Sequence, residues 1–366
     1  MRIVLAPNSF KGSASAIQVA NWLAHGINKK DPSIEVVQAP IADGGDGSLE
    51  VLESAGFAAK SITATDALGA KIEARIGIRD DSAFIESALI IGLQPLNGKK
   101  LEPLRASSFG LGEAINQAIE LGCRKIILGL GGSATTDGGA GALAAMGVRF
   151  LDSSGKELAL GGGSLIDLAK IETDQLLKRI KDIEFVAVSD VTNPLLGDAG
   201  SAKVFAPQKG ASADEVALLE AGLTNLVTIT KSNNAIANGA GAAGGLGFMA
   251  LEFLGATLVD GTTWILQETD FTRKIAGADL IITGEGRYDA QSASTKAPAN
   301  VARLAKERGV PVALVCGEII LAPNGFAASY QLKDQGGIDE VIRNPQVFLE
   351  ALGERIAQES ADFITK

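Results

Sequence analysis

The spacing of apolar residues near the N-terminus predicts a strand, a helix and a second strand. A short apolar run at residues 3–6 predicts a buried strand, and another follows at 34–39. Between them, behind a capping Ser13 or Ser15, apolar residues recur at helical spacing: Ile17, Ala20, Leu23, Ala24 and Ile27.

The C-terminal third shows the same alternation. We predict strands at 279–283, 310–316 and 338–342, and helices at 297–307 and 345–364. Strands that alternate with helices indicate a parallel sheet with right-handed crossover connections.

The middle of the chain has a different pattern. Residues 59–88 alternate as an antiparallel meander does, whereas 106–150 predicts a helix, a strand, a glycine-rich turn and a helix. A strand at 183–188 and a helix at 214–231 follow. We therefore predict one α/β domain that both chain ends form, and a second α/β domain inserted into it. The predicted bounds are 1–55 plus 272–366 for the first and 56–271 for the second.

Composition narrows the class of protein. The chain has 366 residues, of which 46% are hydrophobic, and this suits two folded domains better than one. A formal net charge of −10 argues against a general nucleic-acid binder. No apolar run is long enough for a membrane span, and the two cysteines fit a reducing compartment. We expect a cytoplasmic protein with a small-molecule partner and neither a membrane nor a nucleic-acid partner.

Glycine is the compositional outlier, with 44 residues, and residues 128–139 form a glycine-rich stretch after a predicted strand. Such a turn at the start of a helix offers free N–H groups and hydroxyls to a phosphate. A capped helix after a tight turn is the alternative interpretation. The candidate ligand-binding residues here are Gly131, Gly132, Ser133, Thr135, Asp137 and Gly138.

The same stretch also matches a loose dinucleotide fingerprint at Gly129, Gly131 and Ala134. It has no P-loop lysine, so it is not a Walker A motif. A dinucleotide-dependent oxidoreductase therefore stays open as a second function.

A second glycine-rich stretch begins at residue 283. It places Glu285, Arg287 and Asp289 past the end of a predicted strand, with Lys296 a few residues on. Open α/β sheets bind ligands at this edge. A surface ion pair between Arg287 and a neighbouring acid is the alternative, and such a pair has little energetic value.

Four further segments carry candidate chemistry. Asp43 and Asp46 lie among three glycines at 42–47, which suits a cation, a hydroxyl substrate or an ordinary turn. Asp190 follows the predicted strand at 183–188 and suits a base or a metal ligand, and Lys209 suits neutralisation of phosphate charge. A solvated turn is the alternative for each of them. The small residues around Gly241 and Gly244 allow a backbone or a nucleotide to approach closely.

Histidine is nearly absent from the chain. His25 is the only one, which argues against a Ser-His-Asp triad and a histidine-rich zinc site. Asp, Glu and Lys are therefore the remaining candidates for general acid–base catalysis.

Taken together, seven motifs resemble those of the bacterial glycerate kinase family (type I), in the same order and over nearly the whole chain. They are residues 6–12, 41–47, 131–139, 190–195, 207–211, 239–245 and 284–292. The resemblance implies ATP-dependent phosphorylation of D-glycerate with Mg²⁺. It also implies a flavodoxin-like domain that a second α/β domain interrupts.

In this interpretation the turn at 131–139 and the segment at 239–247 hold ATP, and one or two carboxylates among Asp43, Asp190 and Asp289 hold Mg²⁺. Asp190 orients or deprotonates the substrate hydroxyl. The remaining candidates bind the cofactor or neutralise phosphate and substrate charge: Lys11, Lys209, Gly241, Gly244, Glu285, Arg287 and Lys296.

The chain departs from the family pattern at several positions. Asn8 stands where the family usually has Asp, and Phe109, Leu111, Ile91 and Thr295 also differ. A kinase for another small hydroxy acid and a non-catalytic relative therefore stay open. So do the choice between 2- and 3-phosphoglycerate as product, the residues that touch each ligand, and the oligomeric state, a homo-oligomer included.

Overall fold

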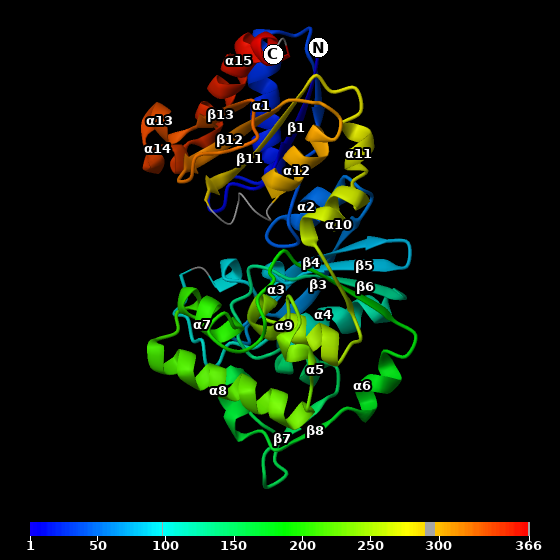
Figure 1. The fold of residues 1–366 in the computed structure, drawn as a ribbon. Helices are drawn as coiled ribbons and strands as arrows, with labels where there is room; N and C mark the ends of the chain where they lie inside the picture. The colour runs from blue at the N-terminus through cyan, green and yellow to red at the C-terminus, as the bar shows by residue number, and fades with distance from the viewer. Residues whose placement is uncertain (97, 290–296, 365–366) are drawn as a thin grey trace. The chain divides into compact units, whose positions relative to one another are not determined.

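The computed structural model describes residues 1–96, 98–289 and 297–364. These form two compact units. Unit 1 comprises Met1–Asp43, Glu50–Ala55 and Thr262–Lys366, and unit 2 comprises Gly44–Leu49 and Gly56–Gly261. Both ends of the chain thus belong to unit 1 (Figure 1).

Unit 1 is built on a five-stranded parallel sheet. Its strands are β1 (Arg2–Pro7), β2 (Glu35–Gln38), β11 (Leu280–Tyr288), β12 (Val312–Ile319) and β13 (Ala328–Gln331). Their order across the sheet is β13-β12-β11-β1-β2, with every pair parallel. This is the 2-1-3-4-5 order of the flavodoxin-like fold, so the predicted fold class is confirmed.

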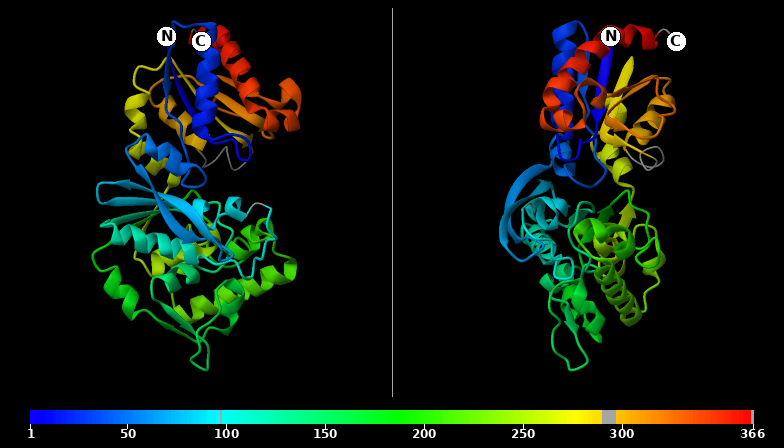
Figure 2. Two further views of the ribbon diagram at one scale, coloured as in Figure 1. Left: turned by 180° about the vertical axis from the view of Figure 1, so that it is seen from behind. Right: turned by 90° about the vertical axis from the view of Figure 1, so that its left-hand side faces the viewer.

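Helices cover both faces of this sheet, because successive strand residues point to opposite faces. Ile3 and Leu5 of β1 pack with α1 (Ala16–Lys30) and α15 (Pro345–Ile364). Val4 and Ala6 pack instead with α11 (Phe271–Lys274) and α12 (Ala297–Lys306). The left view of Figure 2 shows α1 and α15 side by side. The remaining helices of unit 1 are α2 (Ser48–Glu53), α10 (Gly261–Glu268), α13 (Lys333–Gly336) and α14 (Ile338–Arg343).

The predicted strand at 338–342 was wrong, since these residues form α14. Val341 is buried, whereas Ile338 and Ile342 are exposed. In a buried strand all three apolar side chains would pack in the core. Asp339 and Glu340 occupy the first helical turn, where the helix dipole favours acids. The fifth strand is β13 instead.

Unit 2 contains a six-stranded mixed sheet. Its strands are β3 (Ala58–Thr65), β4 (Lys71–Arg79), β5 (Ser82–Glu86), β6 (Lys125–Gly129), β9 (Glu184–Val188) and β10 (Thr257–Val259). The order is β10-β9-β6-β5-β4-β3. The β3–β4 and β4–β5 pairs are antiparallel, which confirms the predicted meander, and the other pairs are parallel.

A large hydrophobic core joins this sheet to helices of unit 2. The helices are α3 (Ala88–Ile91), α4 (Phe109–Glu120), α5 (Ala140–Ala145), α6 (Asp174–Arg179), α7 (Ser201–Phe205), α8 (Ala213–Thr230) and α9 (Ala242–Glu252). A two-stranded sheet of β7 (Arg149–Leu151) and β8 (Lys170–Glu172) completes the unit. Short 3₁₀ turns lie at η1 (Gln94–Leu96), η2 (Gly162–Asp167), η3 (Pro207–Lys209) and η4 (Asn234–Ile236).

None of the helices in the described part of the chain combines the length and the apolar composition that crossing a bilayer requires.

Candidate active site

The carboxyl ends of three parallel strands of unit 2 meet at one edge of its sheet. In the register of the sheet Glu86 lies beside Gly129, and Gly129 lies beside Val188. The segments that leave β5, β6 and β9 therefore start at the same level. The glycine-rich turn (residues 130–139) follows β6, and Asp190 follows β9 two residues after the strand ends. Such an edge is where open α/β sheets bind ligands.

The glycine-rich turn is open to solvent at its start and buried further on. Gly132 is exposed, with a φ of +64°, which side chains rarely tolerate. From Ser133 to Gly139 every residue is buried. Ser87 fixes the start of the turn, since its hydroxyl donates to the carbonyl oxygens of Gly129 and Gly131 at 2.8 and 3.0 Å.

Asp137 is an internal anchor of the turn. Its carboxylate is 0% exposed. It accepts hydrogen bonds from the Ser108 N–H and hydroxyl at 2.8 and 2.9 Å, and from the N–H groups of Gly139 and Gly141 at 3.1 and 3.2 Å. Burial raises the pKa of this carboxyl, and the four donors act against that rise. The Asp137 carboxylate thus ties the turn to the starts of α4 and α5.

Lys209 brings a second charge to the buried part of the turn. Its side chain is only 4% exposed, and its Nζ donates to Ser133 Oγ at 3.2 Å and to the Thr135 carbonyl oxygen at 2.6 Å. Burial lowers the pKa of this amine to about 7, although the charge of Asp137 acts to raise it. Thr135 Oγ1 is buried and has no hydrogen-bond partner among the described residues.

The segment at 44–49, a loop that runs into the start of α2, lies against the same edge of the sheet. Glu86, 1% exposed, accepts hydrogen bonds from the N–H groups of Gly47 and Leu49 at 2.9 and 2.8 Å. A Cβ added to Gly132 would lie 2.4 Å from Asp46 Oδ1. The structure therefore places the Asp46 carboxylate next to the exposed start of the turn.

Sequence reasoning included Asp46 in the motif at 42–47 but chose only Asp43 from it as a site residue, and it did not select Glu86. The available signal for Glu86 was a carboxylate that closes the apolar strand segment 83–85. The signal for Asp46 was its place in the same acid–glycine motif as Asp43.

The glycines of the segment at 239–247 face protein backbone. A Cβ added to Gly241 would lie 2.2 Å from the Pro194 carbonyl oxygen, and one added to Gly244 would lie 1.9 Å from that of Thr135. The Gly138 N–H also donates to the Gly244 carbonyl oxygen at 3.0 Å. In this structure these glycines allow close packing behind the glycine-rich turn.

Unit 1 carries the other candidates at the carboxyl ends of β1 and β11. The N–H of Asn8, the residue after β1, donates at 2.8 Å to the carbonyl oxygen of Gly284, the last β11 residue that pairs with β1. Asn8 and Glu285 are each 7% exposed. Lys11 is exposed in the turn after β1, and Asp43 is half-buried.

The prediction that Glu285 and Arg287 follow their strand was wrong, because β11 extends to Tyr288 by pairing with β12. Exposed Arg287 faces Glu318 in that pairing, and only half-buried Asp289 follows the strand. Lys296 lies outside the described residues.

Comparison with known proteins now decides the family. The model of the glycerate kinase family matches residues 3–361. This chain belongs to the glycerate kinase family.

Its similarity to members of the glycerate kinase family extends over the full length. Glycerate 2-kinase of Escherichia coli K12 is 39% identical over 356 residues, which cover 94% of this chain and 93% of that protein. Glycerate kinase of Halalkalibacterium halodurans is 37% identical, with 97% of each chain covered. The crystal structure of a "putative glycerate kinase 2" from Salmonella typhimurium LT2 superposes with a TM-score of 0.82 at 34% identity, covering 100% of both chains.

The candidate carboxylates of this glycerate kinase family member are oxygen donors, the kind of ligand that Mg²⁺ takes. Among residues 1–96, 98–289 and 297–364, no three His, Cys, Asp or Glu side chains form a metal-binding group. Mg²⁺ in phosphotransferases typically takes one or two carboxylates together with substrate phosphates. Asp190, an oxygen donor at the carboxyl edge of the unit 2 sheet, fits that requirement.

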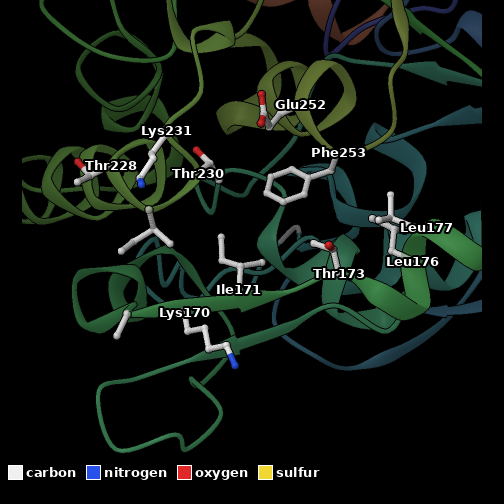
Figure 3. A pocket seen from close by; sticks show the side chains of 12 residues that line it. Lys170, Ile171, Thr173, Leu176, Leu177, Thr228, Thr230, Lys231, Glu252 and Phe253 are labelled. Carbon is white, nitrogen blue, oxygen red and sulfur yellow. The ribbon is translucent and has the colours of Figure 1, made fainter.

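A cavity of about 550 Å³ lies elsewhere in unit 2 of this family member (Figure 3). Residues of β8 and α6, the end of α8 and the end of α9 line it. Two of its charged side chains have protein partners, since Lys170 donates to Glu172 at 2.7 Å and Glu252 accepts from Asn234 at 2.8 Å. None of the candidate site residues lines it. The cavity is therefore separate from the candidate active site.

Proposed function

We propose that this chain is a glycerate kinase, which transfers a phosphoryl group from ATP to a hydroxyl group of glycerate. The observation that carries the proposal is the glycine-rich turn, open at Gly131 and Gly132, at the same sheet edge as Asp190. Family membership supplies the reaction, and the turn supplies a chemically suitable place for the phosphates.

The exposed start of the turn suits an anion. A turn without Cβ atoms presents backbone N–H groups to phosphate oxygens at close range. Gly132 provides such a position with its φ of +64°. The buried part of the turn, with Ser133 and Thr135, then supports the phosphate-binding backbone.

Mg²⁺ would lie between the ATP phosphates and one or two carboxylates, for which Asp43, Asp190 and Asp289 are the candidates. When bound, the ion neutralises phosphate charge. Asp46 joins these candidates because its carboxylate lies next to Gly132.

Unit 1 carries two exposed cations that the motifs also select. Lys11 and Arg287 are assigned to neutralise phosphate or carboxylate charge, and Glu285 remains a cofactor-binding candidate from the motif. Phosphoryl transfer relies mainly on positioning and on charge neutralisation, for which these side chains are suited.

Asp190 is assigned to orient the substrate hydroxyl or to accept its proton. Asp190→Asn keeps the shape of the side chain and removes its basicity, so turnover should fall by about 100-fold or more, with less than a threefold change in the KM for ATP. Steady-state kinetics measure both quantities. Asp198→Asn is the matched control, because Asp198 is fully exposed and pairs with Lys203. Unchanged turnover in Asp190→Asn would remove this role.

Two assays separate this function from its alternatives. The melting temperature should rise with ATP and Mg²⁺ and stay unchanged with NAD(H), because selective ligand binding stabilises the folded state. ATP consumption should then be measured with D-glycerate and with a panel of other small hydroxy acids. Stabilisation by NAD(H) alone would favour an oxidoreductase, and turnover with another acid alone would reassign the substrate.

A further inference from the structure

We propose that Lys209 is a positioning residue, which fixes the phosphate-binding turn from its buried side and does not touch the phosphates. The inference deepens the proposed function and rests on it. In this proposal Lys209 fixes the shape of the turn. Its role thus differs from that of a cation that contacts the ligand directly.

The first support is the geometry of the amine. Nζ of Lys209 bonds a side-chain oxygen, Ser133 Oγ, and a main-chain oxygen, Thr135 O, at 3.2 and 2.6 Å. Both acceptors belong to the buried part of the turn. Two bonds to residues two positions apart restrict the path of the backbone between them.

The second support is the packing around the same carbonyl group. Gly244 approaches the Thr135 carbonyl oxygen so closely that a Cβ there would lie 1.9 Å from it. Two segments of the chain, one with Lys209 and one with Gly244, thus pack against the Thr135 carbonyl group. The exposed part of the turn is Gly132, which precedes both acceptors of Lys209.

The third support is that the role does not need the charge. A neutral lysine amine retains two N–H donors, which is the number that Ser133 and Thr135 require. A lysine that contacts phosphate acts instead through its positive charge. Since the pKa of Lys209 lies at about 7, with Asp137 as the charged group acting on it, both protonation states are accessible. The two roles therefore predict different pH dependence.

The test is the affinity for a nonhydrolysable ATP analogue with Mg²⁺, measured by calorimetry on the full chain. Lys209→Met should weaken binding at least tenfold, because it fills the space without donating hydrogen bonds. Ser133→Ala should have a smaller effect, and the double variant should lie within threefold of Lys209→Met, since Ser133 acts through the amine. Lys203→Met, which removes an exposed lysine from nearby α7, should bind normally.

The pH series decides between positioning and direct contact. From pH 6.5 to 8.5 the ratio of wild-type to Lys209→Met affinity should change less than threefold if Lys209 positions the turn. A fall of tenfold or more would show that the ammonium contacts phosphate and would overturn the proposal. Should Lys209→Met not fold, the wild-type affinity alone between these pH values, together with Ser133→Ala, gives the same decision.

The outcome also distinguishes this role from the proposed function. A folded Lys209→Met variant with wild-type affinity overturns the role of Lys209 and leaves the kinase proposal standing. Wild-type protein that binds no ATP analogue contradicts both proposals.

Discussion

Two buried side chains of opposite charge, Asp137 and Lys209, stabilise the glycine-rich turn of unit 2. Burying a charge is costly unless hydrogen bonds replace its hydration. Asp137 meets that requirement with four donors and Lys209 with two acceptors. The turn is thus held by hydrogen bonds that extend to α4, α5 and η3. The shape of the proposed phosphate site therefore depends on two buried residues, Asp137 and Lys209, that need not contact the ligand.

Lys209 should give unit 2 a measurable pH dependence of stability. Its pKa is about 7 in the folded protein and near 10.5 in an exposed lysine. Between these values the unfolded chain binds more protons, so the free energy of unfolding should rise with pH, by about 1 kcal/mol per unit. Lys209→Met lacks this contribution. The difference between wild type and variant should therefore grow in favour of wild type from pH 7 to 9.

Hydrogen exchange of peptides from unit 2 is the suitable measurement for this prediction. The two tryptophans and two tyrosines, Trp22, Trp264, Tyr288 and Tyr330, all belong to unit 1, so aromatic fluorescence reports on that unit. Lys203→Met should follow the wild-type pH dependence. A difference that stays constant or shrinks over this range would contradict the lowered pKa.

At the scale of elements, the ends of β6 and β9 were predictable from the sequence. Asp190 and the glycine-rich turn follow β9 and β6 as the polar exits of two apolar runs predicted. The local pattern of apolar and polar residues was insufficient where pairing with a neighbouring strand decides how far a strand extends. Pairing with β12 extends β11 to Tyr288, and three apolar residues at 338–342 form α14 where a strand was predicted.

For the same reason the sequence left open whether a backbone or a nucleotide approaches the glycines at 239–247. A glycine requirement that comes from a distant carbonyl group is visible only when both segments are placed. The sequence showed the small residues at Gly241 and Gly244 but not the carbonyl oxygens of Pro194 and Thr135 against which they pack.

Gly244→Ala tests that packing within the kinked start of α9. Both Gly244 and Gly255 have positive φ, +76° and +60°, but a Cβ on Gly255 would meet nothing within 4 Å. Gly255→Ala should therefore cost about 1 kcal/mol from backbone strain alone. Gly244→Ala should cost about 3 kcal/mol or more, because the backbone must also shift.

Urea unfolding followed by far-UV circular dichroism, together with hydrogen exchange of unit 2, measures both glycine variants. Equal costs for the two substitutions would contradict the close approach of Gly244 to Thr135.

At the scale of the whole molecule, unit 1 depends on both ends of the chain. Strand β1 pairs with β11, and helix α15 packs against α1. Gly26 and Gly353 permit this approach, since a Cβ on Gly26 would lie 2.0 Å from the Glu350 carbonyl oxygen and one on Gly353 would lie 2.5 Å from that of Leu23. Unit 1 can thus form its complete core only after α15, the last helix of the chain, has been synthesised.

Leu352→Ala tests this dependence. Leu352 is 1% exposed in the core between α15 and α1, so truncation should cost 2–5 kcal/mol, of the order seen for buried leucines. Val347→Ala on the same helix should change stability by less than about 0.5 kcal/mol, because Val347 is 66% exposed. Tryptophan fluorescence during urea unfolding reports on unit 1 directly, since Trp22 lies in α1. Similar effects for both variants would contradict this packing.

The most direct measurement of the central claim is ³¹P NMR of the purified protein with ATP, Mg²⁺ and D-glycerate. The account predicts that the ATP signals are replaced by those of ADP and of one phosphoglycerate, whose chemical shift and coupling identify the phosphorylated hydroxyl. Omitting D-glycerate should leave ATP intact. Wild-type protein that binds ATP and Mg²⁺ but forms no phosphoglycerate would contradict the account.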